Sequence, residues 1–214
     1  MIAAVVPAAG ESRRMGTPKQ LLPFGGTTVL GHVVDQLLAS TVDEVCVVVG
    51  HEADRVADSL SARPVRIVVN PDCRAGMLSS IRSGLGAVAD SSAAVLIALG
   101  DQPGITPELV DRMLQSFRTC GKGILVPVYD GKRGHPLLVS MRYRDEILAR
   151  HDDVGLRGLL EAHPDDVLEL GVSTPAVLQD LDDPEDYQRE LARLGDPLPP
   201  DSSGDRPADK PPAG

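Results

Sequence analysis

The sequence predicts an α/β protein: a Rossmann-like three-layer α/β/α sandwich with a mostly parallel sheet. Short, almost continuously apolar runs alternate with longer stretches at helical spacing. Such runs are typical of strands that a parallel sheet buries on both faces, and right-handed crossovers then place helices on both faces. Aromatic residues are scarce, with no Trp, three Tyr and two Phe, so the core has to be aliphatic.

The alternation fills the first two thirds of the chain. Strands are predicted at Ile2–Val6, Glu44–Val49, Arg66–Val69 and Ala94–Leu99. Helices are predicted at Val29–Ala39, Asp54–Leu60, Met77–Val88 and Pro107–Phe117. The last of these helices has a clear start, because Thr106 is a good N-cap residue and Pro107 suits the first helical position.

The pattern changes after a fifth strand at Ile124–Val128. Tyr129–Gly134 is rich in turn residues and Pro136–Val139 returns as a short strand, which indicates a hairpin or an antiparallel excursion. Further helices are predicted at Arg144–Arg150, Gly155–Ala162 and Pro184–Leu194, with a strand at Asp166–Leu170. We predict one domain over residues 1–194 and a disordered tail over 195–214, because that tail has too little apolar surface to bury.

Charge and cysteine content narrow the class of protein. A formal net charge of −10 argues against a general nucleic-acid binder, since phosphate backbones require broad basic surfaces. The three cysteines lack metal-type spacing and are expected to be reduced thiols. The apolar N-terminus lacks the basic region of a signal peptide, and no stretch is long enough to span a membrane. We expect a cytoplasmic protein without nucleic-acid or membrane partners.

The first predicted strand ends in a glycine-containing loop, AAGESRRMGTPKQLLPFGG. Ala8, Ala9 and Gly10 are small enough to let the backbone approach a ligand, so that amides can face phosphate oxygens. Arg14 and Lys19 add cations. The loop matches neither the P-loop nor the dinucleotide-binding fingerprint. An ordinary turn is the alternative, but the added cations favour a phosphate-binding loop.

Acidic residues follow the fourth and the last predicted strands. Asp101 comes directly after the fourth strand, at the edge where parallel sheets bind ligands, and it suits Mg²⁺ held against a triphosphate. The alternative is a simple turn residue before Pro103. Asp180 and Asp182 precede the last helix and either one is placed to complete the metal site. Glu185 and Asp186 are interpreted as acids of the first helical turn.

Two further segments are candidate walls of the site. Asn70–Ser83 contains Ser79, Ser80 and Arg82 at the start of a helix, where hydroxyls either cap the helix or meet a nucleotide. Lys132–Pro136 carries Gly134 and His135 beside two cations, which suits a second, anionic substrate; an exposed basic turn is the alternative. His135 lacks the partner spacing of a zinc site or a hydrolytic triad.

Together these segments resemble one family. The loop, MLSSIRSGL, ALGDQP, RGHPLL and DLDDPEDY are similar, in the same order, to the motifs of molybdenum cofactor cytidylyltransferases, members of the MobA-like NTP transferases. The resemblance spans about residues 2–194. It implies a fold of the nucleotide-diphospho-sugar transferase type. It also implies transfer of CMP from CTP to the terminal phosphate of molybdopterin, with release of pyrophosphate.

The resemblance also implies residue roles. Arg14, Lys19 and Asp101 are the expected catalytic residues, and Asp101 with Asp182 the expected Mg²⁺ ligands. The expected nucleotide contacts are Ala8, Ala9, Gly10, Arg14, Lys19, Ser79 and Ser80. Gly134 and His135 are the expected acceptor contacts. Expected partners are CTP, the molybdopterin cofactor and, transiently, a molybdoenzyme or its chaperone.

One position departs from the family pattern, and the substrates stay open. Asp183 stands where the family commonly has Thr, which adds a negative charge near the expected metal. Guanylyltransferase relatives usually have A-G-G in the loop and Asp in place of Pro18, so the loop favours CTP. A cytidylyltransferase for a different phosphorylated acceptor and a non-catalytic nucleotide-binding protein also agree with these motifs. A dehydrogenase is disfavoured because the dinucleotide fingerprint is missing.

Overall fold

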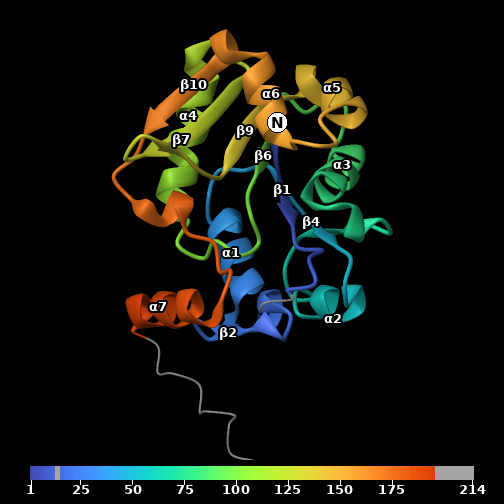
Figure 1. Cartoon of the computed structure of the whole chain (residues 1–214), viewed down its shortest axis with the longest axis vertical. Helices are drawn as coiled ribbons and strands as arrows, with labels where there is room; N and C mark the ends of the chain where they lie inside the picture. The colour runs from blue at the N-terminus through green and yellow to red at the C-terminus, as the bar shows by residue number, and fades with distance from the viewer. Residues whose placement is uncertain (13–14, 196–214) are drawn as a thin grey trace, which may run out of the picture.

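A mixed sheet forms the centre of the computed structural model, which describes residues 1–12 and 15–195 (Figure 1). The strand order is β10 (Val167–Gly171), β7 (Ile124–Tyr129), β9 (Leu137–Ser140), β6 (Ala94–Ile97), β1 (Ile2–Pro7), β4 (Glu44–Val49) and β5 (Arg66–Val69). The hairpin strand β8 (Lys132–Arg133) pairs with β7. Only β8 and β9 of these strands run antiparallel to their neighbours. The predicted mostly parallel sheet and its antiparallel excursion are both confirmed.

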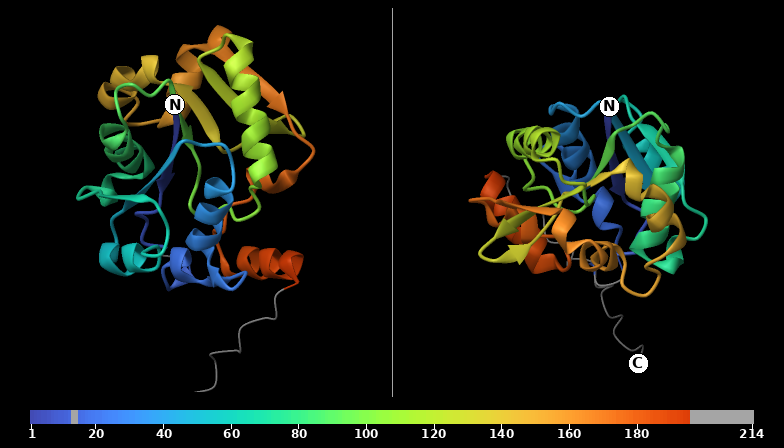
Figure 2. Two further views of the ribbon diagram at one scale, coloured as in Figure 1. Left: turned by 180° about the vertical axis from the view of Figure 1, so that it is seen from behind. Right: turned by 90° about the horizontal axis from the view of Figure 1, so that it is seen from above.

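Helices cover both faces of the sheet, as predicted. One face carries α1 (Val29–Leu38), α2 (Ala53–Asp58) and α4 (Pro107–Cys120); the other carries α3 (Met77–Ala87), α5 (Arg144–Ala149) and α6 (Leu156–Ala162). In the left view of Figure 2, α1 and α4 lie in front of the sheet. Because side chains alternate along a strand, Ala4 and Val6 of β1 belong to the first core cluster and Ala3 and Val5 to the second.

Some element ends differ from their predicted positions by one to three residues. The fourth predicted strand ends at Ile97, before the residues that turn toward the site, and α2 ends at Asp58. The start of α4 is as predicted: the Thr106 hydroxyl oxygen accepts a hydrogen bond from the Leu109 amide at 3.4 Å. Five short 3₁₀ turns connect the remaining described segments: η2 (Lys19–Leu21), η3 (Cys73–Ala75), η4 (Met141–Tyr143), η5 (Pro164–Asp166) and η6 (Pro175–Leu178).

The close packing of α3 on the sheet depends on one glycine. A Cβ atom at Gly84 would lie 2.4 Å from Cγ1 of Val5 and 3.1 Å from Cγ2 of Val48. The helix therefore approaches β1 and β4 more closely than any residue with a side chain allows. Gly86, two residues later, faces open space. The position of α3 matters because its first turn borders both of the cavities described below.

The last helix, α7 (Pro184–Leu194), packs against a small hairpin, β2 (Pro23–Phe24) with β3 (Thr27–Thr28), beyond the carboxyl ends of the parallel strands (Figure 1). Phe24, Leu181 and Tyr187 belong to a separate apolar cluster there, and the Tyr187 hydroxyl donates to the Pro23 carbonyl at 2.5 Å. The segment before α7 thus returns to the edge where β1 and β6 end. No helix among the described residues has the length and apolar character needed to cross a membrane.

Candidate active site

The carboxyl-end edge of the sheet carries a cavity of about 240 Å³, called here the first cavity. Its lining includes six of the residues predicted for the site: Ala8, Ala9, Gly10, Lys19, Ser80 and Asp101. They come from the loop after β1, the 3₁₀ turn η2, the helix α3 and the turn after β6. The sheet therefore brings together residues that lie far apart in the sequence.

The loop after β1 is held by bonds from its own segment and from β4. The Ala8 amide donates to the Val48 carbonyl at 2.8 Å and is therefore already engaged within the sheet, although Ala8 lines the first cavity. Among the described residues, the Ala9 and Gly10 amides have no backbone acceptor and remain the candidates for phosphate contact. The buried Gln20 side chain donates to the Gly10 carbonyl at 3.2 Å and the Ala8 carbonyl at 3.4 Å.

Lys19 connects the loop to both predicted metal ligands. Its ammonium group forms an ion pair with Asp101 and lies 3.6 Å from Oδ1 of Asp182. It also donates to the Leu181 carbonyl at 2.8 Å, and the Leu181 amide donates to the Asp101 carbonyl at 3.0 Å. Burial raises the pKa of the Asp180 carboxyl, and the negative charges of Asp101 and Asp182 add to this rise. Among the described residues, the three carboxylates of Asp101, Asp180 and Asp182 therefore surround the Lys19 ammonium.

The donor set fits a divalent cation that is shared with a ligand. Among the described residues, no group of three or more His, Cys, Asp or Glu side chains is arranged to hold a metal on its own. Mg²⁺ does not need such a group, because it is commonly held by one or two carboxylates together with substrate phosphates. Asp101 and Asp182 both approach a single cationic group, the Lys19 ammonium. Asp101 in the lining of the first cavity and Asp182 on the other side of Lys19 match that requirement.

The Asp183 departure has a structural role. Its carboxylate accepts a hydrogen bond from the Asp186 amide at 2.9 Å and caps α7. In return, the Asp186 carboxylate accepts from the amides of Asp182 at 3.0 Å and Asp183 at 3.2 Å. This capping box engages the extra charge at the start of α7, where an acidic residue stabilises the helix. Asp186, interpreted as a first-turn acid, also fixes the backbone of Asp182.

The serines at the start of α3 differ in their surroundings. Ser80 is buried and lines the first cavity, whereas Ser79 is absent from that lining. The Asn70 side-chain amide donates to both hydroxyl oxygens, at 2.8 Å for Ser79 and 3.0 Å for Ser80. The prediction of Ser79 as a nucleotide contact is therefore not supported by its position. Asn70 belongs to the segment that the sequence analysis names as a candidate wall of the site, but no sequence pattern identified Asn70 itself as important.

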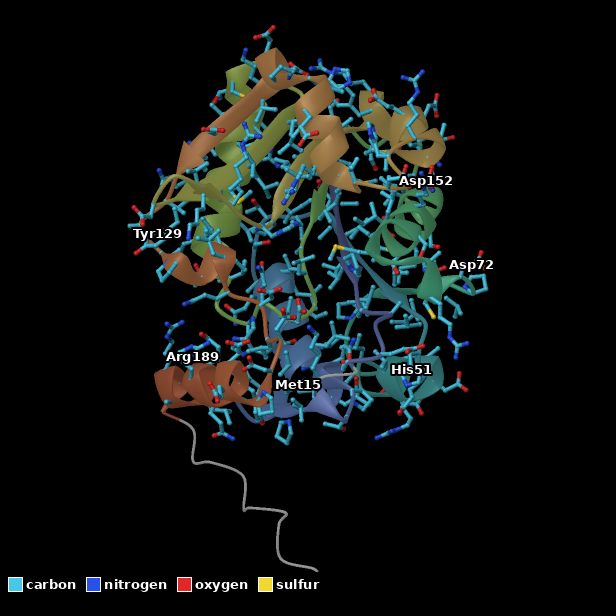
Figure 3. The ribbon with its side chains drawn as sticks, in the orientation of Figure 1. Met15, His51, Asp72, Tyr129, Asp152 and Arg189 are labelled. Carbon is cyan, nitrogen blue, oxygen red and sulfur yellow. The ribbon has the colours of Figure 1, made fainter. Side chains whose placement is uncertain are left out.

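Arg82 lies on α3, but its side chain has a structural role and does not line either cavity. Its guanidinium donates to the carbonyls of Ile147 at 2.9 Å and Arg150 at 2.7 Å, and to the Asp152 carboxylate at 2.6 Å. Figure 3 shows Asp152 next to α3, away from the loop residue Met15 at the lower end of the molecule. Arg82 therefore fixes the segment that follows α5. Arg14, predicted as a catalytic and nucleotide-binding residue, lies outside the described residues.

A second cavity of about 920 Å³ lies beside the first, and Met77 lines both. It contains the two predicted acceptor residues, Gly134 and His135. The Gly134 amide donates to the Pro127 carbonyl at 2.9 Å, and the His135 amide donates to the Val177 carbonyl at 2.8 Å. Burial lowers the pKa of the His135 imidazole, and the negative charge of Asp101 opposes this shift. The His135 imidazole is therefore neutral at pH 7, and it lies near enough to Asp101 for the two side chains to interact electrostatically.

The second cavity combines an apolar floor with three cations and two carboxylates, Glu161 and Glu169. Its apolar lining residues are Met77, Leu78, Ile81, Val126, Leu137, Val154, Leu156 and Leu160. Of its three cations, Arg133 forms an ion pair with Glu169 at 2.7 Å. Within the described part of the chain, Lys132 and Arg157 have no such carboxylate partner. Arg157 comes from α6, which no sequence pattern assigned to the site.

The fold and the two cavities can be compared with known proteins. The family model of the MobA-like NTP transferase domain matches residues 4–167 of this chain. The chain belongs to this family. The nucleotidyltransferase chemistry of the family agrees with Lys19, which pairs with Asp101 in the lining of the first cavity and approaches Asp182 beside it.

Two curated relatives carry different activities in their names. Nicotine blue oxidoreductase of Paenarthrobacter nicotinovorans is 33% identical over 199 residues, covering 89% of this chain and 96% of the relative. The molybdenum cofactor cytidylyltransferase of Escherichia coli K12 is 26% identical over 187 residues, covering 87% of this chain and 93% of the relative. The family is thus shared by proteins with different substrates.

Solved structures confirm the fold. The crystal structure of Rv0371c from Mycobacterium tuberculosis H37Rv matches with a TM-score of 0.81 and 33% identity, over 89% of this chain and 97% of that one. A complex of Rv0371c with manganese matches with a TM-score of 0.76 and 32% identity, over 89% and 98% of the two chains. The predicted family and fold class are both confirmed.

Proposed function

We propose that the chain transfers CMP from CTP to the terminal phosphate of a molybdopterin-type cofactor, with Mg²⁺, and releases pyrophosphate. One observation carries this proposal. The Lys19 ammonium lies between the Asp101 and Asp182 carboxylates at a small cavity, directly beside a large cavity with an apolar floor. Phosphoryl transfer needs such positioning and charge neutralisation more than covalent chemistry by the protein.

The first cavity suits the nucleotide. The Ala9 and Gly10 amides and the Lys19 ammonium are placed to bind triphosphate oxygens. Asp101 and Asp182 would hold Mg²⁺ together with phosphate oxygens, and the ion would neutralise the charge that develops as pyrophosphate leaves. Lys19, which pairs with Asp101, would contribute its positive charge to the phosphates. The manganese complex of the relative Rv0371c supports a divalent cation in this fold.

The second cavity suits the acceptor. Its aliphatic floor favours an acceptor with an apolar ring system, and the cations Lys132 and Arg157 suit an anionic group on it. The terminal phosphate of such an acceptor is already ionised at pH 7, so the attack on the α-phosphorus needs no general base. His135, neutral because burial lowers its pKa, is therefore assigned to orienting the acceptor. Polyol phosphate acceptors fit this apolar floor less well.

The relative from P. nicotinovorans raises a second candidate, an oxidoreductase that acts on nicotine blue. The apolar floor of the second cavity does not distinguish this activity from transfer to a pterin. The cluster of Lys19, Asp101 and Asp182 favours phosphate chemistry, and the loop lacks the dinucleotide fingerprint. Guanylyl transfer and transfer to another phosphorylated acceptor share the same first cavity.

The test measures pyrophosphate release with each of the four NTPs, Mg²⁺ and molybdopterin, and identifies the dinucleotide product by mass spectrometry. We expect the highest kcat/KM with CTP and loss of activity with EDTA. A higher kcat/KM with GTP would make the protein a guanylyltransferase. Nucleotide binding without any transfer, or bleaching of nicotine blue with a reduced cofactor, would refute the proposal in favour of a binding protein or an oxidoreductase.

A further inference from the structure

Asn70 connects the end of β5 to the start of α3 through every polar group of its side chain. It is buried, with 3% of its surface exposed. Its side-chain oxygen accepts from the Asp72 amide at 3.0 Å. Its side-chain nitrogen donates to the hydroxyl oxygens of Ser79 at 2.8 Å and Ser80 at 3.0 Å. An amide offers two donors and one acceptor oxygen, so the orientation of Asn70 is fixed in all three directions.

The hydroxyl groups of Ser79 and Ser80 both accept a hydrogen bond from Asn70, but they differ in whether their own proton has an acceptor. Ser79 donates its single proton to the carbonyls of Gly76 at 2.8 Å or Asp72 at 3.0 Å. Ser80 accepts from Asn70, but no acceptor for its own proton is found among the described residues. A hydroxyl has one proton to donate, and a buried donor without an acceptor is costly. Ser80, unlike Ser79, lines the first cavity, where a ligand can provide that acceptor.

We infer that Asn70 is a positioning residue that orients the Ser80 hydroxyl as a hydrogen-bond donor to the nucleotide. The Asn70 nitrogen engages a lone pair of the Ser80 oxygen and so directs the proton away from itself. The acceptor is an oxygen or nitrogen atom of the nucleotide. The inference rests on the proposed nucleotide site in the first cavity, and it is independent of the identity of the acceptor substrate.

The test is the dissociation constant of CTP with Mg²⁺, measured by calorimetry for the full chain and its variants. Ser80→Ala removes the donor with little risk to folding and is expected to raise the dissociation constant about tenfold. Ser80→Cys keeps a weak donor, so its dissociation constant is expected to lie between those of the wild type and Ser80→Ala. Asn70→Ala is expected to weaken binding as well, and the Asn70→Ala/Ser80→Ala double variant to be no weaker than Ser80→Ala alone, because Asn70 acts through Ser80.

Ser83→Ala is the matched control. Ser83 lies one turn further along α3, its hydroxyl donates to the Ser79 carbonyl at 3.0 Å, and it lines neither cavity. Its dissociation constant should stay within twofold of the wild type. A parallel titration with inorganic triphosphate assigns the acceptor atom: weakening by Ser80→Ala in both titrations places the donor on a phosphate, and weakening for CTP alone places it on the base or ribose.

Two results would overturn the inference. One is a Ser80→Ala dissociation constant within twofold of the wild type, and the other is a double variant whose loss equals the sum of the single losses. A wild-type protein that binds no nucleotide would overturn both this inference and the proposed function. A wild-type protein that binds CTP but forms no dinucleotide would refute the proposed function alone, because the role of Ser80 is measured by binding.

Discussion

The two cavities are built in opposite ways. In the first, most of the polar side chains are already held by other groups of the protein: Lys19 pairs with Asp101, Gln20 donates to the loop carbonyls, and Asn70, behind the wall, donates to Ser80. In the second, the walls are mostly aliphatic, and the cations Lys132 and Arg157 lack carboxylate partners within the described residues. A paired site is fixed before its ligand arrives, whereas an apolar cavity with exposed cations is completed by its ligand. Fixed geometry suits the chemical step, and adaptable walls suit the choice of acceptor.

The largest expected effect removes a charge from the first cavity. Asp101→Ala should lower kcat/KM for transfer about a thousandfold, because one of the two carboxylates proposed to hold the charge-neutralising Mg²⁺ is lost. Lys19 keeps its bond to the Leu181 carbonyl, so the melting temperature should change little. The measurement is pyrophosphate release. Asp90→Ala, which breaks an exposed ion pair with Arg144, is the control, and an equal loss in both variants would contradict the assignment.

The next effect concerns α3, which both cavities share through Met77. Gly84→Ala places a Cβ atom 2.4 Å from Val5 and should destabilise the protein by about 1–3 kcal/mol, as overpacked cores do. Gly86→Ala in the same helix meets nothing within 4 Å and should stabilise it by roughly 0.5–1 kcal/mol, the usual gain of Ala over Gly in a helix. Chemical unfolding measures both, and effects of the same sign would show that α3 does not depend on this close approach.

Features of the first cavity that depend on strand order can be predicted from the sequence, whereas those that depend on side-chain hydrogen bonds cannot. The strand–helix alternation predicts the sheet, and its carboxyl edge then places the loop and Asp101 together, because both directly follow buried strands. The D-P-E-D pattern at 183–186 is a capping signature that the sequence already contains, although its first acid also suggests added charge near a metal. The roles of Gln20 and Asn70 are not predictable in this way, since they consist of side-chain bonds that only the folded chain creates.

The second cavity is not predictable as a whole. Its walls come from α3, the β7–β9 region, α6 and β10, and no single motif spans them. Gly134 and His135 are predictable because they belong to one short motif. Arg157 is not, because an isolated exposed arginine on a helix carries no local signal. The predicted boundary between a domain at 1–194 and a tail at 195–214, and the cytoplasmic location, stay predictions.

A smaller effect separates the two cavities kinetically. Arg157→Ala should raise the KM for the acceptor about tenfold, the cost of one charged contact, and leave the KM for CTP within twofold. Steady-state kinetics with each substrate varied in turn provide the test. Arg118→Ala, on the last turn of α4, is the control for loss of one positive charge. An equal rise in both KM values would contradict the division into a nucleotide cavity and an acceptor cavity.

The smallest effect is a pH dependence of stability in the second cavity. Burial lowers the folded-state pKa of His135 below its ordinary value of 6.5, so the unfolded chain takes up a proton more readily. The contribution of neutral His135 to stability is therefore complete above pH 6.5 and decreases as the pH falls through 6.5 toward the lowered value. His135→Asn should flatten the decrease of the unfolding midpoint between pH 7 and 5. An unchanged slope would show that other groups cause it.

The reversed strand β9 has a consequence for how acceptor choice can be altered. Because β9 runs against β6, the segment that enters β9 arrives at the same edge that the chain leaves after β6, which brings His135 near Asp101. The hairpin between β7 and β9 is fixed at its base by the Gly134 and His135 amides and reaches outward to the exposed Gly131. Residues at that exposed tip can be exchanged or inserted without disturbing a parallel strand pair. One strand direction thus separates the fixed half of the enzyme from the half in which new substrates can be accommodated.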